Sequence, residues 1–297
     1  MIKSTSISRK IFMAFNYFVL LSITFICILP FLHLISVSLS SNLSAAAGEV
    51  GLIPKGFTLQ AYQYIIKKRE FIVAMLISFE RVFMGTTLSL FLVILTAYPL
   101  SKSNKDFKQR TVYTWIFAFT MFFSGGLIPT YMVVKSTGII DSIWALILPG
   151  AVSAWNIVLM LNFFRQVPKE LEEAAIIDGA GHWTILWRIY LPVSVPAVVT
   201  ILLFIVIFHW NSWFDGILYM NKLEKYPLQT YLYTVVMSLN SRNLGMLSPD
   251  EFERVKNINE KTVKTAQIFL GALPILLVYP FLQRFFVKGL IIGSVKG

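Results

Sequence analysis

The chain contains 297 residues, of which 56% are hydrophobic and 14% are charged. A soluble domain averages about 25% charged residues, so this composition excludes an ordinary soluble domain and predicts a membrane protein. The net charge of +11 is not concentrated in a dense Lys/Arg run, so we predict no nucleic-acid partner and assign the charge to loops that face anionic lipid. The single cysteine and three scattered histidines exclude a disulfide framework and predict no metal site.

Apolar runs recur along the chain and predict an all-α, polytopic fold with six transmembrane helices, because about 20 apolar residues suffice to cross a bilayer. The predicted spans cover residues 14–39, 71–100, 112–134, 139–164, 193–220 and 265–287. Residues 1–13 form a basic N-terminus, and residues 14–297 form one membrane domain because no linker divides them. The first run is too long for a signal-peptide core and is expected to be retained. Gly125-Gly126 and Pro129 are predicted to break the third span and Pro149-Gly150 the fourth, and Pro274 is predicted to kink the sixth. Such breaks are tolerated where neighbouring protein or a cavity satisfies the backbone.

Two charged residues, Glu80 and Arg81, lie near the start of the second predicted span. We expect them at the membrane interface, because a charge at the bilayer centre costs about 2.5–3.5 kcal/mol. Residues 40–69, which precede this span, are expected to form a folded or surface-lying loop. Residues 221–264 form the one sizeable outer loop.

A polar segment separates the fourth and fifth apolar runs and covers residues 165–192. Pro168 suits a first helical position, and acidic residues follow it where the helix dipole favours negative charge. Gly179 is expected to take the left-handed conformation that ends this helix, and Gly181 keeps the turn loose. Apolar spacing predicts a second short helix over residues 183–190, which Pro192 ends. The segment therefore predicts a compact two-helix knob at the membrane surface.

The spacing within this segment is similar to a known pattern. It consists of Glu173-Ala174-Ala175, three residues, Gly179, nine residues, Ile189, one residue and Leu191-Pro192. It resembles the EAA loop of the membrane subunits of binding-protein-dependent ABC importers. Flanking sequences resemble the maltose-type carbohydrate branch, namely Phe163-Phe164-Arg165, Ile177-Asp178-Gly179-Ala180 and Trp210-Asn211. Residues 226–232 resemble the branch that handles complex oligosaccharides with lipoprotein receptors. The resemblance runs from about Leu76 to Gly297.

The resemblance implies the type I permease architecture of ABC importers, with this chain as one transmembrane subunit of an importer for sugars. The implied partners are a second homologous permease, two ATPase subunits and an extracytoplasmic solute-binding protein. In relatives the EAA loop is the coupling helix, which is held in a cleft of the ATPase subunit. The residues implied for ATPase coupling are Glu172, Glu173, Ala174, Ala175, Asp178, Gly179, Gly181, Leu191 and Pro192. The cytoplasmic tail, residues 284–297, is implied to contact the ATPases through Gly293, Lys296 and Gly297, or else is a frayed basic terminus at the lipid surface.

The source of energy is indicated by what the sequence lacks. No Gly-x-x-x-x-Gly-Lys-Ser/Thr motif is present, so the chain has no phosphate-binding loop of that kind. We therefore expect a transport subunit that is not itself an enzyme and carries no cofactor, with ATP and Mg bound by the partner ATPases. An ion-coupled secondary carrier would need a carboxylate at mid-membrane, for which Asp215 is the one candidate. That carrier and an ABC permease for a non-sugar solute are the alternatives.

Six spans would place both termini on the same side of the membrane. Basic residues are divided equally between the two sides, and only the shorter loops favour the side of residues 165–192 as cytoplasmic. The resemblance implies the same orientation, since the EAA loop is cytoplasmic in relatives. The chain is thus expected to be a multi-pass protein of the cell membrane with both termini in the cytoplasm.

Aromatic and polar side chains in the fourth and fifth spans are candidates for a substrate path, because sugars bind aromatic faces and hydrogen-bonding groups. The candidates are Trp155, Asn156, Asn162, Phe208, Asn211, Trp213 and Asp215. Asn211 and Asp215 are four residues apart and are expected to share one helical face that points into a cavity. The alternatives are aromatic anchoring at the bilayer interface and, for Asn211, a hydrogen bond between helices.

Overall fold

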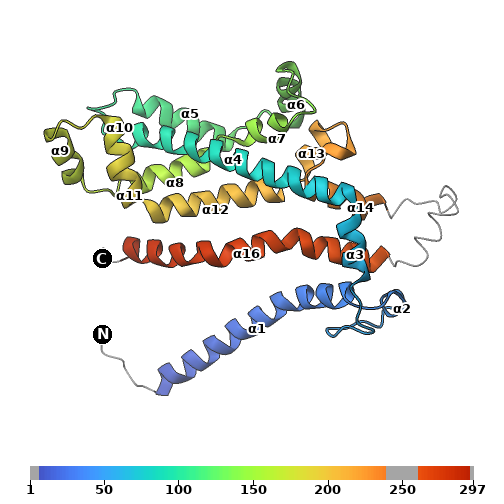
Figure 1. Cartoon of the computed structure of the whole chain (residues 1–297). Helices are drawn as coiled ribbons and strands as arrows, with labels where there is room; N and C mark the ends of the chain where they lie inside the picture. Colours follow the sequence, from blue (N-terminus) through green and yellow to red (C-terminus); the bar gives the residue numbers. More distant parts are fainter. Residues whose placement is uncertain (1–6, 239–259, 295–297) are drawn as a thin grey trace. The chain divides into compact units, whose positions relative to one another are not determined.

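The computed structural model describes residues 7–238 and 260–294, and every regular element in these ranges is a helix (Figure 1). The predicted all-α class is therefore confirmed. The chain divides into two compact units. The first unit comprises residues 1–69 and 234–273, and the second comprises residues 70–233 and 274–297.

The first unit is built on the long helix α1. Its described elements are α1 (Ile7–Ser38), α2 (Asn42–Ala46), α3 (Gln60–Lys67), the last residues of α14 (Leu228–Ser238) and the first part of α16 (Glu260–Ser294). The Ser38 hydroxyl lies 2.7 Å from the Tyr62 hydroxyl, which fastens α3 to the end of α1. Thr262 on α16 donates to Asn42 on α2 at 3.1 Å. Residues 40–69 are thus folded, as predicted.

The second unit contains residues 274–294 of α16 and the elements that run from the second predicted span past the fifth. They are α4 (Arg69–Ser101), α5 (Arg110–Phe122), α6 (Leu127–Ser136), α7 (Ile143–Ile147), η1 (Leu148–Gly150), α8 (Ala154–Phe164), α9 (Lys169–Ile177), α10 (His182–Ile185), η2 (Leu186–Tyr190), α11 (Leu191–Val193), α12 (Val195–Asn211), α13 (Phe214–Tyr219), η3 (Leu223–Lys225) and most of α14. Helices α9 and α10 lie at the Ser101 end of α4, whereas α13 lies towards its other end (Figure 1).

Three described helices are long and apolar enough to cross a membrane: α1, α4 and residues 261–278 of α16. Three bent pairs pass the same test together, so counting each pair as one span gives up to six. Helices α5 and α6 meet at 118°, α7–η1 and α8 at 51°, and the α10–α11 segment and α12 at 85°. The breaks predicted at Gly125-Gly126 and Pro149-Gly150 are confirmed, whereas Pro129 lies inside α6 and does not break the span. The fifth span is shorter than predicted, because α12 ends at Asn211.

The core of the second unit lies between α4, α8, η2 and α12. Its buried side chains include Val93, Ala97, Ile157, Met160, Phe164, Leu186 and Ile201. Helix α12 approaches α4 closely at Gly85, where an added Cβ would lie 2.6 Å from Nε2 of His209. Small residues permit such close crossings between membrane helices. At the Ser101 end of α4, Tyr98 and Leu100 belong to the same buried cluster as Ile185, Leu186 and Tyr190, so the core joins the 165–192 segment to this end of α4.

Candidate functional site

Gly179 makes the sharp turn between the two short helices of the 165–192 segment. Helix α9 ends at Ile177, and Gly179 has φ +78°, in the left-handed region. The Gly179 N–H donates to Ile176 O and the Ala180 N–H donates to Ala175 O, which satisfies carbonyls at the helix end. An added Cβ at Gly179 would meet no atom within 4 Å. The glycine is therefore required by the backbone conformation alone, and the predicted turn is confirmed.

Other local predictions for this segment need correction. Pro168 is the N-cap of α9 rather than its first residue. Gly181 has φ −77° and ψ 163°, an extended conformation that any residue adopts, so the turn does not require glycine there. Pro192 does not end the second helix, which runs from His182 through the π turn η2 into α11. Pro192 lies in α11, shortly after the π turn, and the helix continues past it to Val193.

The knob, defined here as α9 and α10 with the turn between them, exposes an apolar surface beside its charges. Glu173, Ala174 and Asp178 are exposed, while Ala175 is half-buried and packs on the core. Ile177 is 85% exposed, and Ile176 and Trp183 are also exposed. Apolar side chains on an otherwise polar projection are typical of a surface that docks another protein.

Glu172 points inward, although it was predicted among the docking residues. Its carboxylate accepts hydrogen bonds from Lys102 Nζ and from the Tyr190 hydroxyl, each at 2.6 Å. The side chains of Lys102 and Glu172 are 6% and 17% exposed. Burial lowers the pKa of Lys102, and the hydrogen bond with Glu172 opposes that shift. Of the remaining predicted coupling residues, Leu191 packs against the core and Pro192 is exposed.

The sequence reasoning missed Lys102 and Tyr190 as members of this site. Lys102 counted there only as one of several loop charges, and Tyr190 only as an apolar helix position. The predicted tail contacts remain predictions. Gly293 lies in α16, whereas Lys296 and Gly297 lie outside the described residues, as do residues 239–259 of the predicted outer loop.

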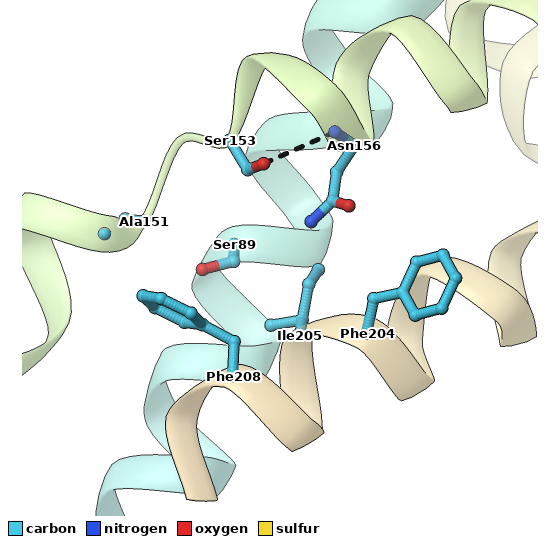
Figure 2. Close-up of a pocket in the computed structure, with 8 residues that line it drawn as sticks. Ser89, Ala151, Ser153, Asn156, Phe204, Ile205 and Phe208 are labelled. Carbon is cyan, nitrogen blue, oxygen red and sulfur yellow. Dashed lines mark hydrogen bonds between the residues drawn. The ribbon is translucent and has the colours of Figure 1, made fainter. Parts of the chain in front are cut away.

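Two cavities lie in the second unit. The outer cavity is open, with a volume of about 570 Å³, and is lined by Ala145, Leu146, Pro149, Gly150, Ile207, Phe208, Asn211, Ser212, Trp213, Phe214, Asp215 and Tyr219. The inner cavity is more enclosed, with a volume of about 200 Å³, and is lined by Ser89, Gly150, Ala151, Ser153, Asn156, Phe204, Ile205 and Phe208. Figure 2 shows Ser89 on α4, Asn156 on α8 and Phe208 on α12 around this inner space.

The cavities gather five of the seven predicted path residues. Phe208 lines both cavities, Asn156 lines the inner one, and Asn211, Trp213 and Asp215 line the outer one. Trp155 and Asn162 are exposed on α8 and belong to neither lining.

Asn211 and Asp215 do not share a helical face, which corrects the prediction. Helix α12 ends at Asn211, Ser212 is extended, and α13 begins at Phe214. Asp215 is instead ion-paired with Arg81 of α4. Arg81 is fully buried in the protein, where this carboxylate and two backbone carbonyls accept hydrogen bonds from its guanidinium, and its depth in the membrane remains a prediction. Asp215 is therefore held in an ion pair with a buried arginine.

Comparison with known proteins adds independent information. Residues 123–292 match the family described as "Binding-protein-dependent transport system inner membrane component". The chain is 40% identical to the polygalacturonan/rhamnogalacturonan transport system permease protein YtcP of Bacillus subtilis (strain 168), over 97% of this chain and 99% of the relative. It is 41% identical to protein LplC of the same organism, over 97% of this chain and 96% of the relative. A solved chain from a bacterial ABC transporter involved in the import of the acidic polysaccharide alginate has a TM-score of 0.86 and 31% identity, covering 95% of this chain and 98% of that chain.

Proposed function

Because the chain belongs to the family of binding-protein-dependent transport system inner membrane components, we propose that it is a transmembrane subunit of an ATP-driven importer of oligosaccharides. A second homologous permease completes the pathway, and two ATPase subunits bind ATP and Mg. An extracytoplasmic binding protein delivers the sugar. The observation that carries this proposal is the exposed knob with its left-handed Gly179 turn, in a chain that has no nucleotide-binding loop of its own.

The knob is the part of the chain that is suited to receive force from an ATPase. Glu173 and Ala174 present a charge and a small side chain on the exposed side of α9, and Ile177 adds an apolar contact. The small side chain permits close approach of another protein. ATP binding would close the two ATPases and draw the knobs of the two permeases together, which turns the cavities towards the binding protein.

The cargo we propose is an oligosaccharide that contains uronic acid. One relative is named for polygalacturonan and rhamnogalacturonan and a solved neighbour for alginate, and all three polymers carry carboxylates. Among the described lining residues of the outer cavity, Asp215 is the only carboxylate, and Arg81 neutralises it. The lining thus carries no net negative charge that would repel an anionic sugar, and it presents aromatic faces and an amide to which the sugar can bind.

The orientation we propose places the knob and both termini in the cytoplasm. Lys105 follows α4 at the end that carries the knob, and Lys222 follows α13 towards the other end of α4; both are exposed (Figure 1). In a Cys27→Ser background, Lys105→Cys should react with an impermeant thiol reagent only from the cytoplasm and Lys222→Cys only from outside. Reversed labelling would overturn the orientation and the coupling role together.

The transport function is tested by reconstituting the two permeases and two ATPases in liposomes with the binding protein. Digalacturonate or trigalacturonate on the binding protein should stimulate ATP hydrolysis and accumulate inside, whereas maltotriose should do neither. Accumulation of maltotriose but not of the galacturonates would support the proposal that the complex is a sugar importer and would contradict the proposal that its cargo is acidic. Uptake by this chain alone under a proton or sodium gradient would support the ion-coupled carrier instead.

A further inference from the structure

The ammonium group of Lys102 lies in a closed setting between the knob and α4. Lys102 directly follows the last residue of α4 and is 7% exposed. Its Nζ lies 4.1 Å from the centroid of the Tyr98 ring and 4.0 Å from that of Tyr190. The same atom donates to Glu172 on α9 at 2.6 Å. Two aromatic faces and one carboxylate therefore hold the cation.

The contacts of Lys102 and of its neighbours Tyr98 and Tyr190 join α4 to α9, α10, η2 and α5. The Tyr190 hydroxyl of η2 donates to the other oxygen of Glu172 at 2.6 Å. The Tyr98 hydroxyl lies 3.3 Å from Nδ1 of His182, the first residue of α10. Arg110, at the start of α5, donates to the backbone carbonyl of Lys102 at 2.9 Å. Glu172 is thus the one acidic side chain of α9 that reaches into this cluster rather than towards the knob surface.

Helix α4 connects this cluster with both cavities. Ser89, which lines the inner cavity, and Arg81, which binds Asp215 of the outer cavity, lie on the same helix as Tyr98. At 1.5 Å per residue, Ser89 lies about 20 Å and Arg81 about 31 Å along the axis from Lys102. A shift of α9 that is passed to the end of α4 would therefore move the walls of the cavities.

We propose that Lys102 and Glu172 form a positioning pair that transmits the displacement of the knob to α4 and so couples ATP hydrolysis to the opening of the cavities. This proposal rests on the proposed function, since it assigns a role in the same coupling. The pair acts inside the second unit and does not contact the ATPase. Exposed Glu173 and Asp178 remain acidic residues of that docking surface.

A purely structural role makes a different prediction for paired substitutions. Removing one member of a buried ion pair leaves an uncompensated charge and is strongly destabilising, whereas replacing both members by neutral groups is often tolerated. Lys102→Met and Glu172→Gln should therefore each lower the yield of assembled complex. The double variant should recover the yield. If the pair only stabilises the fold, the double variant also recovers transport.

The deciding quantity is sugar transported per ATP hydrolysed by assembled complexes in liposomes. We expect the double variant Lys102→Met/Glu172→Gln to assemble to within about twofold of the natural protein, yet to transport at least about fivefold less sugar per ATP, a loss at the lower end of typical coupling effects. The matched control is Lys105→Met/Glu170→Gln, which removes an exposed lysine and an exposed glutamate from the same two segments. The control should retain the natural ratio.

A double variant with the natural transport per ATP would overturn the proposal. If the double variant does not assemble, Tyr190→Phe decides the question, because it removes only the hydroxyl that binds Glu172. A reduced ratio in Tyr190→Phe supports transmission, and a natural ratio overturns it. Failure of the unsubstituted complex to show sugar-stimulated ATP hydrolysis would instead count against the proposed function, so the two failures are distinguishable.

Discussion

Arg81 of α4 and Asp215 of α13 form an ion pair inside the second unit, although 134 positions separate them in the sequence. The Arg81 guanidinium also donates to the carbonyls of Ser212 at 3.3 Å and Leu146 at 3.1 Å. Arg81 therefore attaches two segments to α4: the break between α12 and α13, and the end of α7. The outer cavity owes its shape to this pair, since Leu146, Ser212 and Asp215 all line it.

Substitution of Asp215 by Asn should destabilise the protein rather than change its sugar preference. The Arg81 side chain is 0% exposed, so in this variant its buried positive charge would lose its carboxylate partner. Breaking such a buried pair costs about 3–5 kcal/mol. We expect a lower melting temperature and poor recovery of the complex in detergent. Normal recovery with altered sugar selectivity would instead make Asp215 a residue of the substrate path.

Gly179→Val should uncouple ATP hydrolysis from transport. A non-glycine residue in the left-handed conformation costs about 1–2 kcal/mol, more for a β-branched side chain, so α9 and α10 would meet at another angle. Assembly should survive because no atom lies within 4 Å of the new Cβ. The measurement is sugar-stimulated ATP hydrolysis per assembled complex. Gly181→Ala is the matched control, since Gly181 has φ −77°; a loss of stimulation in both variants would contradict the conformational explanation.

Asn211→Leu should lower transport without reducing assembly. Asn211 is exposed in the outer cavity, where its amide can bind a sugar hydroxyl. Losing one hydrogen bond costs about 0.5–1.5 kcal/mol, so a graded fall in rate or affinity is expected. Asn162→Leu, on an exposed residue outside both cavities, should transport normally. Low yield of Asn211→Leu complexes that keep full activity would show that this amide joins helices instead.

Acid should weaken the contact between Asp141 and Lys225. Asp141 precedes α7 in a left-handed conformation with φ 62°, and it accepts from Lys225 Nζ at 2.6 Å and from the Asn221 N–H at 3.0 Å. The hydrogen bond from Lys225, and then that from Asn221, hold the pKa of Asp141 below its ordinary value of 3.8. A lowered pKa contributes stability that is present above 3.8 and is lost as the pH falls through the folded value.

The contribution of the Asp141 charge to stability is tested by measuring the melting temperatures of the natural protein and of Asp141→Asn from about pH 5 down into stronger acid. Asparagine tolerates the left-handed conformation, so the change tests the charge. The natural protein should melt higher at about pH 5, and the difference should vanish in stronger acid. Glu49→Gln is the control and should melt like the natural protein. The ion pair of Glu49 with Lys55 is exposed, and its nitrogen and oxygen atoms are 3.5 Å apart. A constant difference between Asp141→Asn and the natural protein at every pH would exclude titration of Asp141.

The sequence by itself determined the features that depend on local patterns. The apolar runs indicated a multi-pass helical membrane protein, because about 20 apolar residues suffice for a helix to cross a bilayer. The spacing from Glu173 to Pro192 identified the family, which the comparisons confirm. Gly179 was predictable because the left-handed turn is a property of the residue and its immediate neighbours.

Only the tertiary structure decided which side chains meet. Glu172 and Lys102 are 70 positions apart, and nothing in the periodicity of either segment indicates that they are partners. The fifth span ends at Asn211 because Ser212 is extended and Arg81 binds its carbonyl, not because a local glycine or proline interrupts the helix. Pro192 was predicted to end a helix, but the helix continues through the π turn and past the proline to Val193. Helix periodicity and turn residues act over a few neighbours, whereas these pairings depend on packing between distant elements.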